Sequence, residues 1–333
     1  MLDTASPGEA DGYLPSGSVL GFRFLAWTIV ATLFAFLINA YLKFWQGWPG
    51  VVAILGDGGI LAWLQSLFYV GAVAGPAAFV VRTKGRSLRQ DSQTLTSLAA
   101  YITRAAFWMV FFVGIADATI SFLRVEGLLE AVVGEQLSQD LARNQFRGPY
   151  VHMPLIGLAL VVALFTRTLG FTWLALLVVL AELQIVISRF VFSYEQAFMG
   201  DLVRFWYGGL FLFASAYTLL EDGHVRVDVL YAASTGRTKG LVNAAGALLM
   251  GIPLCWVVLA IGLGQRSSVI ASPLLAFEVT QAGFGMYVKY LLAGFLAIFA
   301  ASMMVQFAAT VLDGVADYRG EPGKRRAASA TAH

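Results

Sequence analysis

Apolar stretches of about 20 residues alternate with short polar connections along most of the chain. Each stretch is long enough to cross the hydrocarbon core of a bilayer as a helix, since that core is about 30 Å thick. We place eight of them at residues 19–44, 60–81, 98–122, 151–165, 171–192, 202–220, 241–263 and 286–312. They are apolar on all sides, whereas strands of a membrane barrel alternate polar and apolar positions. The pattern predicts an all-α, polytopic integral membrane protein.

Basic residues decide the predicted orientation of these spans. The fourth span is the weakest, because it is short and Pro154 lies near its start, so seven spans are an alternative. Cytoplasmic loops are enriched in Lys and Arg. Eight spans put the main basic connections on one side, together with the C-terminal tail: Arg82, Lys84, Arg86, Arg89, Arg167, Arg226, Arg237, Lys239, Arg319, Lys324, Arg325 and Arg326. We therefore predict eight helices with both termini in the cytoplasm.

The regions outside the spans are polar or amphipathic. Residues 1–18 form a polar segment without the features of a cleavable signal peptide, and residues 318–333 form a basic, disordered tail. Two segments, 128–141 and 225–234, have apolar residues at helical spacing, which favours short helices at the membrane interface over plain loops. The expected organisation is a four-helix extension over residues 19–168, followed by a second four-helix domain over residues 169–317.

Two acidic residues interrupt the predicted spans. Asp117 lies among small residues between Gly114 and Thr119, which favours close helix packing or a kink. Glu182 lies in the middle of its helix without a basic residue one turn away. It must be protonated, pair with another helix or subunit, or face water.

The sequence offers little chemistry for catalysis. His152 and His224 fall on opposite sides of the predicted membrane, and the single cysteine, Cys255, is expected to be a packing residue. Only 13% of the residues are charged, 59% are hydrophobic, and the net charge is +2, which does not indicate a nucleic-acid partner. We expect a non-enzymatic protein without a cofactor or a metal.

Three segments in the C-terminal half carry a family resemblance. Ser188-Arg189-Phe190-Val191-Phe192 closes one span, Asp201-Leu202-Val203-Arg204-Phe205-Trp206 opens the next, and the third segment, Glu221-Asp222-Gly223-His224-Val225-Arg226-Val227-Asp228, follows it. Downstream come Glu278 and a stretch ending at Lys289. Together these segments, within residues 169–317, resemble the small permease subunit of the tripartite ATP-independent periplasmic (TRAP) transporters, the DctQ type. The chain differs in having only Asp201 where the family usually has two acids, and in having the N-terminal extension, so it is similar to a long form.

The resemblance implies a small subunit in the bacterial inner membrane, surrounded by lipid, that braces a large permease subunit during sodium-coupled uptake of an organic anion. A periplasmic solute-binding protein would be an indirect partner. The same resemblance makes nine residues candidates for family motifs or subunit contacts: Arg189, Asp201, Trp206, Glu221, His224, Arg226, Asp228, Glu278 and Lys289.

Each motif residue also has a plainer interpretation. Arg226 can pair with a neighbouring acid, and a hydrogen-bonded His224 can fix the turn after Gly223. Arg189 and Asp201 can pair with each other or with a partner subunit. The extra helices keep open a second function, a structural accessory subunit of another inner-membrane complex. A stand-alone channel or transporter is disfavoured because charges within the spans are few.

Overall fold

The computed structural model describes residues 17–167, 170–194, 196–220, 231, 233–279 and 285–323. These residues form helices joined by short connections, and no strand occurs among them. The prediction of an all-α, polytopic membrane protein is confirmed. The predicted interfacial segment 225–234 lies almost wholly outside the described residues, as do most of the N-terminal segment and of the C-terminal tail.

Seven helical stretches within the described residues are long and apolar enough to span a membrane. They are α1 (Gly17–Phe44), α2 (Gly59–Arg82), α3 (Leu88–Val125), the run α6–η2–α7 (Asn144–Arg147, Gly148–His152, Met153–Phe165), α8 (Phe171–Val191), the run α11–η3–α12 (Gly236–Gly246, Ala247–Gly251, Ile252–Leu263) and α14 (Lys289–Arg319). The remaining predicted span falls in α9 (Ala197–Leu220), a helix of 24 residues that begins with the polar Asp201 and Arg204 in its first two turns.

The weak fourth span proves longer than its sequence pattern suggested. It begins at Asn144 rather than Val151, so the continuous helix runs for 22 residues. A π-helical turn, η2, joins α6 to α7 and contains Pro149 and His152. Proline lacks a backbone N–H, and such turns often mark functional positions in helices.

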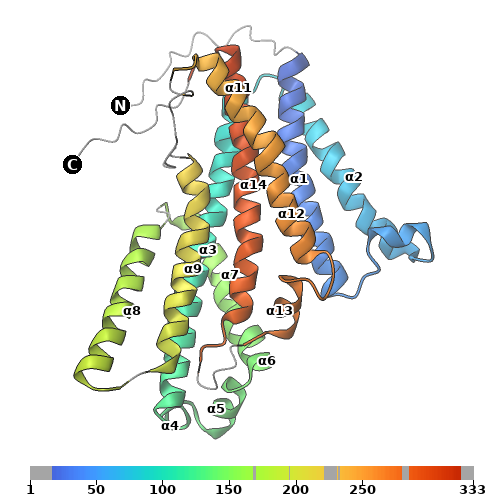
Figure 1. The fold of residues 1–333 in the computed structure, drawn as a ribbon. Helices are drawn as coiled ribbons and strands as arrows, with labels where there is room; N and C mark the ends of the chain where they lie inside the picture. The colour runs from blue at the N-terminus through green and yellow to red at the C-terminus, as the bar shows by residue number, and fades with distance from the viewer. Residues whose placement is uncertain are drawn as a thin grey trace. The chain divides into compact units, whose positions relative to one another are not determined.

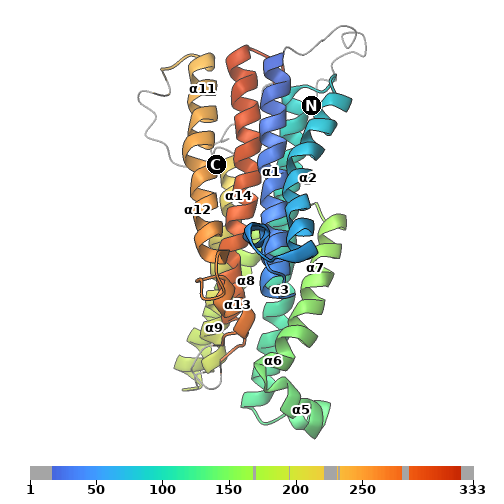
Figure 2. The ribbon, with the colours of Figure 1, turned by 90° about the vertical axis from the view of Figure 1, so that its right-hand side faces the viewer.

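The chain divides into two compact units. Unit 1 contains residues 1–96, 226–252 and 307–326, and unit 2 contains residues 97–225, 253–306 and 327–333. In unit 1, α1 and α2 form an antiparallel pair, with the short helix η1 (Val51–Leu55) in the connection (Figures 1 and 2). In the second helix pair of this unit, α11 packs against the C-terminal half of α14, with Gly240 and Gly314 at the contact.

The contact between α11 and α14 is close because both helices present glycine. A methyl group on Gly314 would lie 2.6 Å from the carbonyl oxygen of Gly240 and 2.9 Å from the Cβ atom of Ala244. We expect Gly314→Leu to destabilise the protein by roughly 1–3 kcal/mol, because the helices would have to move apart. Thermal unfolding in detergent measures this. The same replacement at Gly246, where nothing lies within 4 Å of an added methyl, is the control, and equal losses would contradict the prediction.

In unit 2, α8 and α9 form an antiparallel hairpin (Figure 1). The core contains Phe205, Phe213 and Phe295, which pack ring against ring between α9 and α14. The predicted amphipathic segment 128–141 is present as two short helices, α4 (Leu129–Val133) and α5 (Glu135–Leu141). Gly134 separates them with a φ of 83°, a conformation that residues with a side chain rarely adopt. A further short helix, α13 (Ala271–Ala276), precedes α14.

Candidate functional site

A carboxylate buried in unit 2 organises the largest polar cluster of that unit. Asp117, on α3, is fully buried. Its Oδ1 atom accepts a hydrogen bond from Nη1 of Arg147 at 2.9 Å and lies 3.1 Å from Nε2 of His152. Its Oδ2 atom accepts the backbone N–H of Tyr287 at 2.7 Å. The carboxylate thus joins α3, the start of the α6–η2–α7 run and the segment just before α14.

Arg147 is the cation of this cluster and is also fully buried. Besides Asp117, it donates from Nε and Nη2 to the carbonyl oxygen of Leu141, at 2.9 and 2.7 Å. Its guanidinium carbon lies 4.1 Å from the centre of the Tyr287 ring. A buried ion pair is stable only when its remaining hydrogen-bonding groups are also satisfied. These contacts supply that condition for Arg147.

His152 extends the cluster to α14. Its Nδ1 atom lies 2.8 Å from the hydroxyl oxygen of Tyr290, and both side chains are almost completely buried. In the tautomer that is protonated on Nε2, His152 donates a hydrogen bond to Asp117. Its Nδ1 atom then accepts a hydrogen bond from the hydroxyl of Tyr290. The chain Asp117–His152–Tyr290 therefore links two helices through one imidazole.

A second layer of contacts fixes the segment between α13 and α14. Arg124 donates to the Tyr287 hydroxyl at 2.6 Å and to the carbonyl oxygen of Gly285 at 3.1 Å. The Tyr287 hydroxyl in turn donates to the carbonyl oxygen of Ala142 at 2.8 Å. Asn144 donates to the carbonyl oxygen of Phe277 at 2.7 Å. Apart from the buried Nε atom of Arg124, which has no hydrogen-bond partner in the described part of the chain, these polar groups bond to one another, so the cluster is suited to fixing geometry rather than to binding a reactant.

The sequence prediction for Asp117 was incomplete. Small neighbours do allow close packing, because Gly114 lies against the indole of Trp206. However, Asp117 forms a buried ion pair with Arg147, a residue that lies outside the predicted span 151–165. Arg147, His152, Tyr287 and Tyr290 were missed. Two features of the sequence could have indicated this cluster. One is the acid Asp117 within a predicted span, and the other is the Arg-x₄-His spacing of Arg147 and His152 at the start of the short fourth span.

Two of the candidate motif residues occupy defined positions in α9. Asp201 is mostly buried; it accepts the backbone N–H of Met286 at 3.1 Å and pairs with Arg204 at 3.3 Å. Trp206 is buried and donates to the carbonyl oxygen of Val110 at 3.3 Å. A pairing of Asp201 with Arg189 is not found among the described residues, where Arg189 is exposed. Asp201 instead fixes the segment before α14.

The remaining candidates fall into three groups. Glu278 and Lys289, which were named as separate candidates, form an ion pair at 2.5 Å across the start of α14. Glu182, like Arg189, is exposed on α8 rather than turned toward the rest of unit 2. The third motif segment, with Glu221, His224, Arg226 and Asp228, lies outside the described residues.

The segment between α8 and α9 is tied to the end of α3. The hydroxyl of Tyr194 donates to the Glu126 carboxylate at 2.6 Å. This hydrogen bond and the negative charge of Glu126 raise the pKa of the Tyr194 hydroxyl. The contact is a further link between the segment preceding residue 169 and the one following it.

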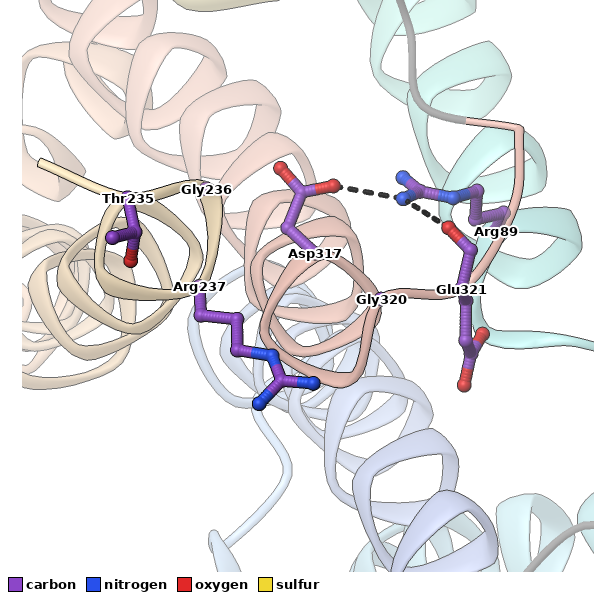
Figure 3. A pocket seen from close by; sticks show the side chains of 7 residues that line it. All are labelled: Arg89, Thr235, Gly236, Arg237, Asp317, Gly320 and Glu321. Carbon is purple, nitrogen blue, oxygen red and sulfur yellow. Dashed lines mark hydrogen bonds and ion pairs between the residues drawn. The ribbon is translucent and has the colours of Figure 1, made fainter.

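Unit 1 contains its own buried charges. Arg23 and Asp91 are completely buried and lie 2.6 Å apart, and Arg86 approaches the other oxygen of Asp91 at 2.8 Å. At the same end of the unit, Arg89 pairs with Asp317 at 2.8 Å on the wall of a pocket of about 510 Å³ (Figure 3). Thr235, Gly236, Arg237, Gly320 and Glu321 complete the wall. Two basic and two acidic side chains give this pocket no strong preference for ligand charge.

A groove of about 460 Å³ lies in unit 2 between α3, α8 and α9. Its walls are largely apolar, with Thr119, Gln184 and Gln196 as the polar exceptions. Neither the Asp117 cluster nor the Glu278–Lys289 pair contributes to it. The groove and the polar cluster are therefore separate features of unit 2.

The C-terminal part of the chain matches a known family. Residues 176–317 match the model described as Tripartite ATP-independent periplasmic transporters, DctQ component. This part of the chain is similar to the DctQ component. The match confirms the resemblance deduced from the motifs, and it extends from α8 into α14. No curated protein and no solved structure matches the chain.

The residues of the Asp117 cluster lie on both sides of the start of the DctQ match. Tyr287 and Tyr290 lie inside the match, whereas Asp117, Arg147 and His152 precede it. The cluster thus fastens the preceding helices α3 and α6–η2–α7 to the region that matches the DctQ model. The matched family is a component of transporters rather than a family of enzymes, and the chain is a multi-pass membrane protein.

Proposed function

We propose that this chain is the small membrane subunit of a TRAP transporter in the bacterial inner membrane. In this role it braces the large permease subunit, which carries an organic anion together with sodium, while a periplasmic solute-binding protein delivers the substrate. The observation that carries the proposal is the DctQ match over residues 176–317, a stretch that includes the α8–α9 hairpin and most of α14. The chain itself performs no catalysis in this proposal and binds no cofactor.

The internal contacts of unit 2 support a bracing role. A brace has to keep its shape under load, and buried, fully hydrogen-bonded ion pairs fix one arrangement of helices. The Asp117 cluster and the Asp201–Met286 contact both hold the segment that precedes α14. The additional helices α3 and α6–η2–α7 then widen the brace, since they share this cluster. With both termini in the cytoplasm, the cluster lies near the periplasmic ends of its helices.

The test is purification of the tagged chain from its native membrane in a mild detergent, with mass spectrometry of the co-purifying proteins. We expect a larger polytopic permease in near-equal amount, absent when an unrelated tagged membrane protein is expressed at the same level. Stable recovery with subunits of an energy-transducing complex, and without a permease, would favour the accessory function and contradict the proposal.

A further inference from the structure

Helix α8 carries an exposed stripe along about half of its length. The stripe consists of Val179, Glu182, Val186 and Arg189, and all four side chains are exposed. Their spacing of three, four and three residues places them within an arc of about 80° on the helix surface. In the most apolar window of α8 only 11% of the residues are buried, the smallest share among the seven candidate spans. The stripe faces away from the protein interior.

Glu182 lies where an exposed carboxylate is least expected. It is the twelfth of the 21 residues of α8, so it lies within about 2 Å of the midpoint of the span. Ionisable residues at this depth normally face the interior of the helix bundle or a partner group. Neither Glu182 nor Arg189 has an ion pair or hydrogen bond to another residue in the described part of the chain. Lipid tails offer Glu182 no partner at this depth.

We propose that the stripe is a docking face for a transmembrane helix of the large permease subunit, with Glu182 as its central anchor. This inference rests on the proposed function for the identity of the partner. The docked helix brings a Lys, Arg or His side chain to Glu182 at mid-membrane depth. It brings an acidic or carbonyl group about 10 Å further along, opposite Arg189. Its small and apolar residues pack on Val179 and Val186.

The charge pattern disfavours a second copy of this chain as the occupant. Two copies inserted in the same direction and related by a two-fold axis along the membrane normal would run their α8 helices parallel. Glu182 would then face Glu182 of the other copy, where two ionised carboxylates repel and neither finds a cation. A different helix with a cation at this depth satisfies the carboxylate.

Photo-crosslinking in native membranes tests the face without altering its charges. A benzoylphenylalanine is placed singly at Val179 or Val186, and at Leu180 or Ile187 as matched controls. The controls are also exposed but lie about 80–100° further round the helix. We expect the large permease subunit as the main adduct at Val179 and Val186, with little at the controls. Equal adducts at all four positions, or permease adducts at the controls alone, would overturn the inference while leaving the proposed function intact.

Charge reversal tests Glu182 as the anchor. We expect Glu182→Lys to lower the apparent affinity for the permease roughly 30-fold or more, and Glu182→Gln to have a smaller effect of the same sign. Glu130→Lys, an exposed acid on α4, is the matched control. Thermal unfolding of each variant separates loss of binding from loss of folding. If Glu182→Lys folds and binds the permease with unchanged affinity, the inference is overturned. If the crosslinkers at Val179 and Val186 instead capture a membrane protein of another complex, both the inference and the proposed function are overturned.

Discussion

Replacing Asp117 by alanine is expected to destabilise the protein by about 3–5 kcal/mol, because it leaves Arg147 buried without its counter-charge. The change also removes the acceptor of the Tyr287 N–H and a partner of His152. The segment before α14 should therefore loosen together with the α6–η2–α7 run. Thermal unfolding in detergent measures the loss, and hydrogen exchange at residues 285–290 locates it.

The matched control for Asp117 is Asp140→Ala. Asp140 pairs with Arg143, but this pair is at the surface, where an ion pair contributes only about 0–1 kcal/mol. A double variant, Asp117→Leu with Arg147→Met, is expected to recover part of the stability, since apolar residues of similar size often replace a buried ion pair without loss. If Asp117→Ala and Asp140→Ala lose equal stability, the buried cluster is not the anchor described above.

Replacing Asp91 by alanine should have an effect of similar size in unit 1, about 3–5 kcal/mol. Asp91 accepts hydrogen bonds from Arg23, Arg86 and Trp27, and Arg23 is completely buried. Without the carboxylate, the hydrogen bonds that Arg23 keeps within the described part of the chain are those to Thr83. The loss is measured as for Asp117, with the exposed Asp57→Ala as the control. A stability equal to that of the control would show that Arg23 finds water or another acceptor.

The helices of this protein were predictable because a bilayer imposes a strong and simple requirement. Apolar runs of about 20 residues have few alternatives to a spanning helix, and their positions agree with the structure to within a few residues in most cases. The beginning of the fourth span was placed too late, at Val151, because Arg147 looks like a residue outside the membrane. The contact with Asp117 allows Arg147 to be part of the continuous helix.

The motif residues were recognised, but the partners of several were not. Asp201 was expected to pair with Arg189 or with a partner subunit, and in the described residues it pairs with Arg204 and the backbone of Met286. Glu278 and Lys289 were also named as separate candidates, and the ion pair between them was not predicted. Short motifs identify residues but do not show which of them meet in the fold.

The sequence by itself determined that this is a polytopic helical membrane protein and that its C-terminal part is similar to the DctQ component of TRAP transporters. Both conclusions depend on local features: the length of apolar runs, and short motifs in a fixed order. Only the tertiary structure decided that Asp117, Arg147, His152, Tyr287 and Tyr290 meet in one buried cluster, and that Glu182 is exposed on α8. Those facts depend on which helix faces pack together, and apolar runs that are hydrophobic all round do not specify their buried face.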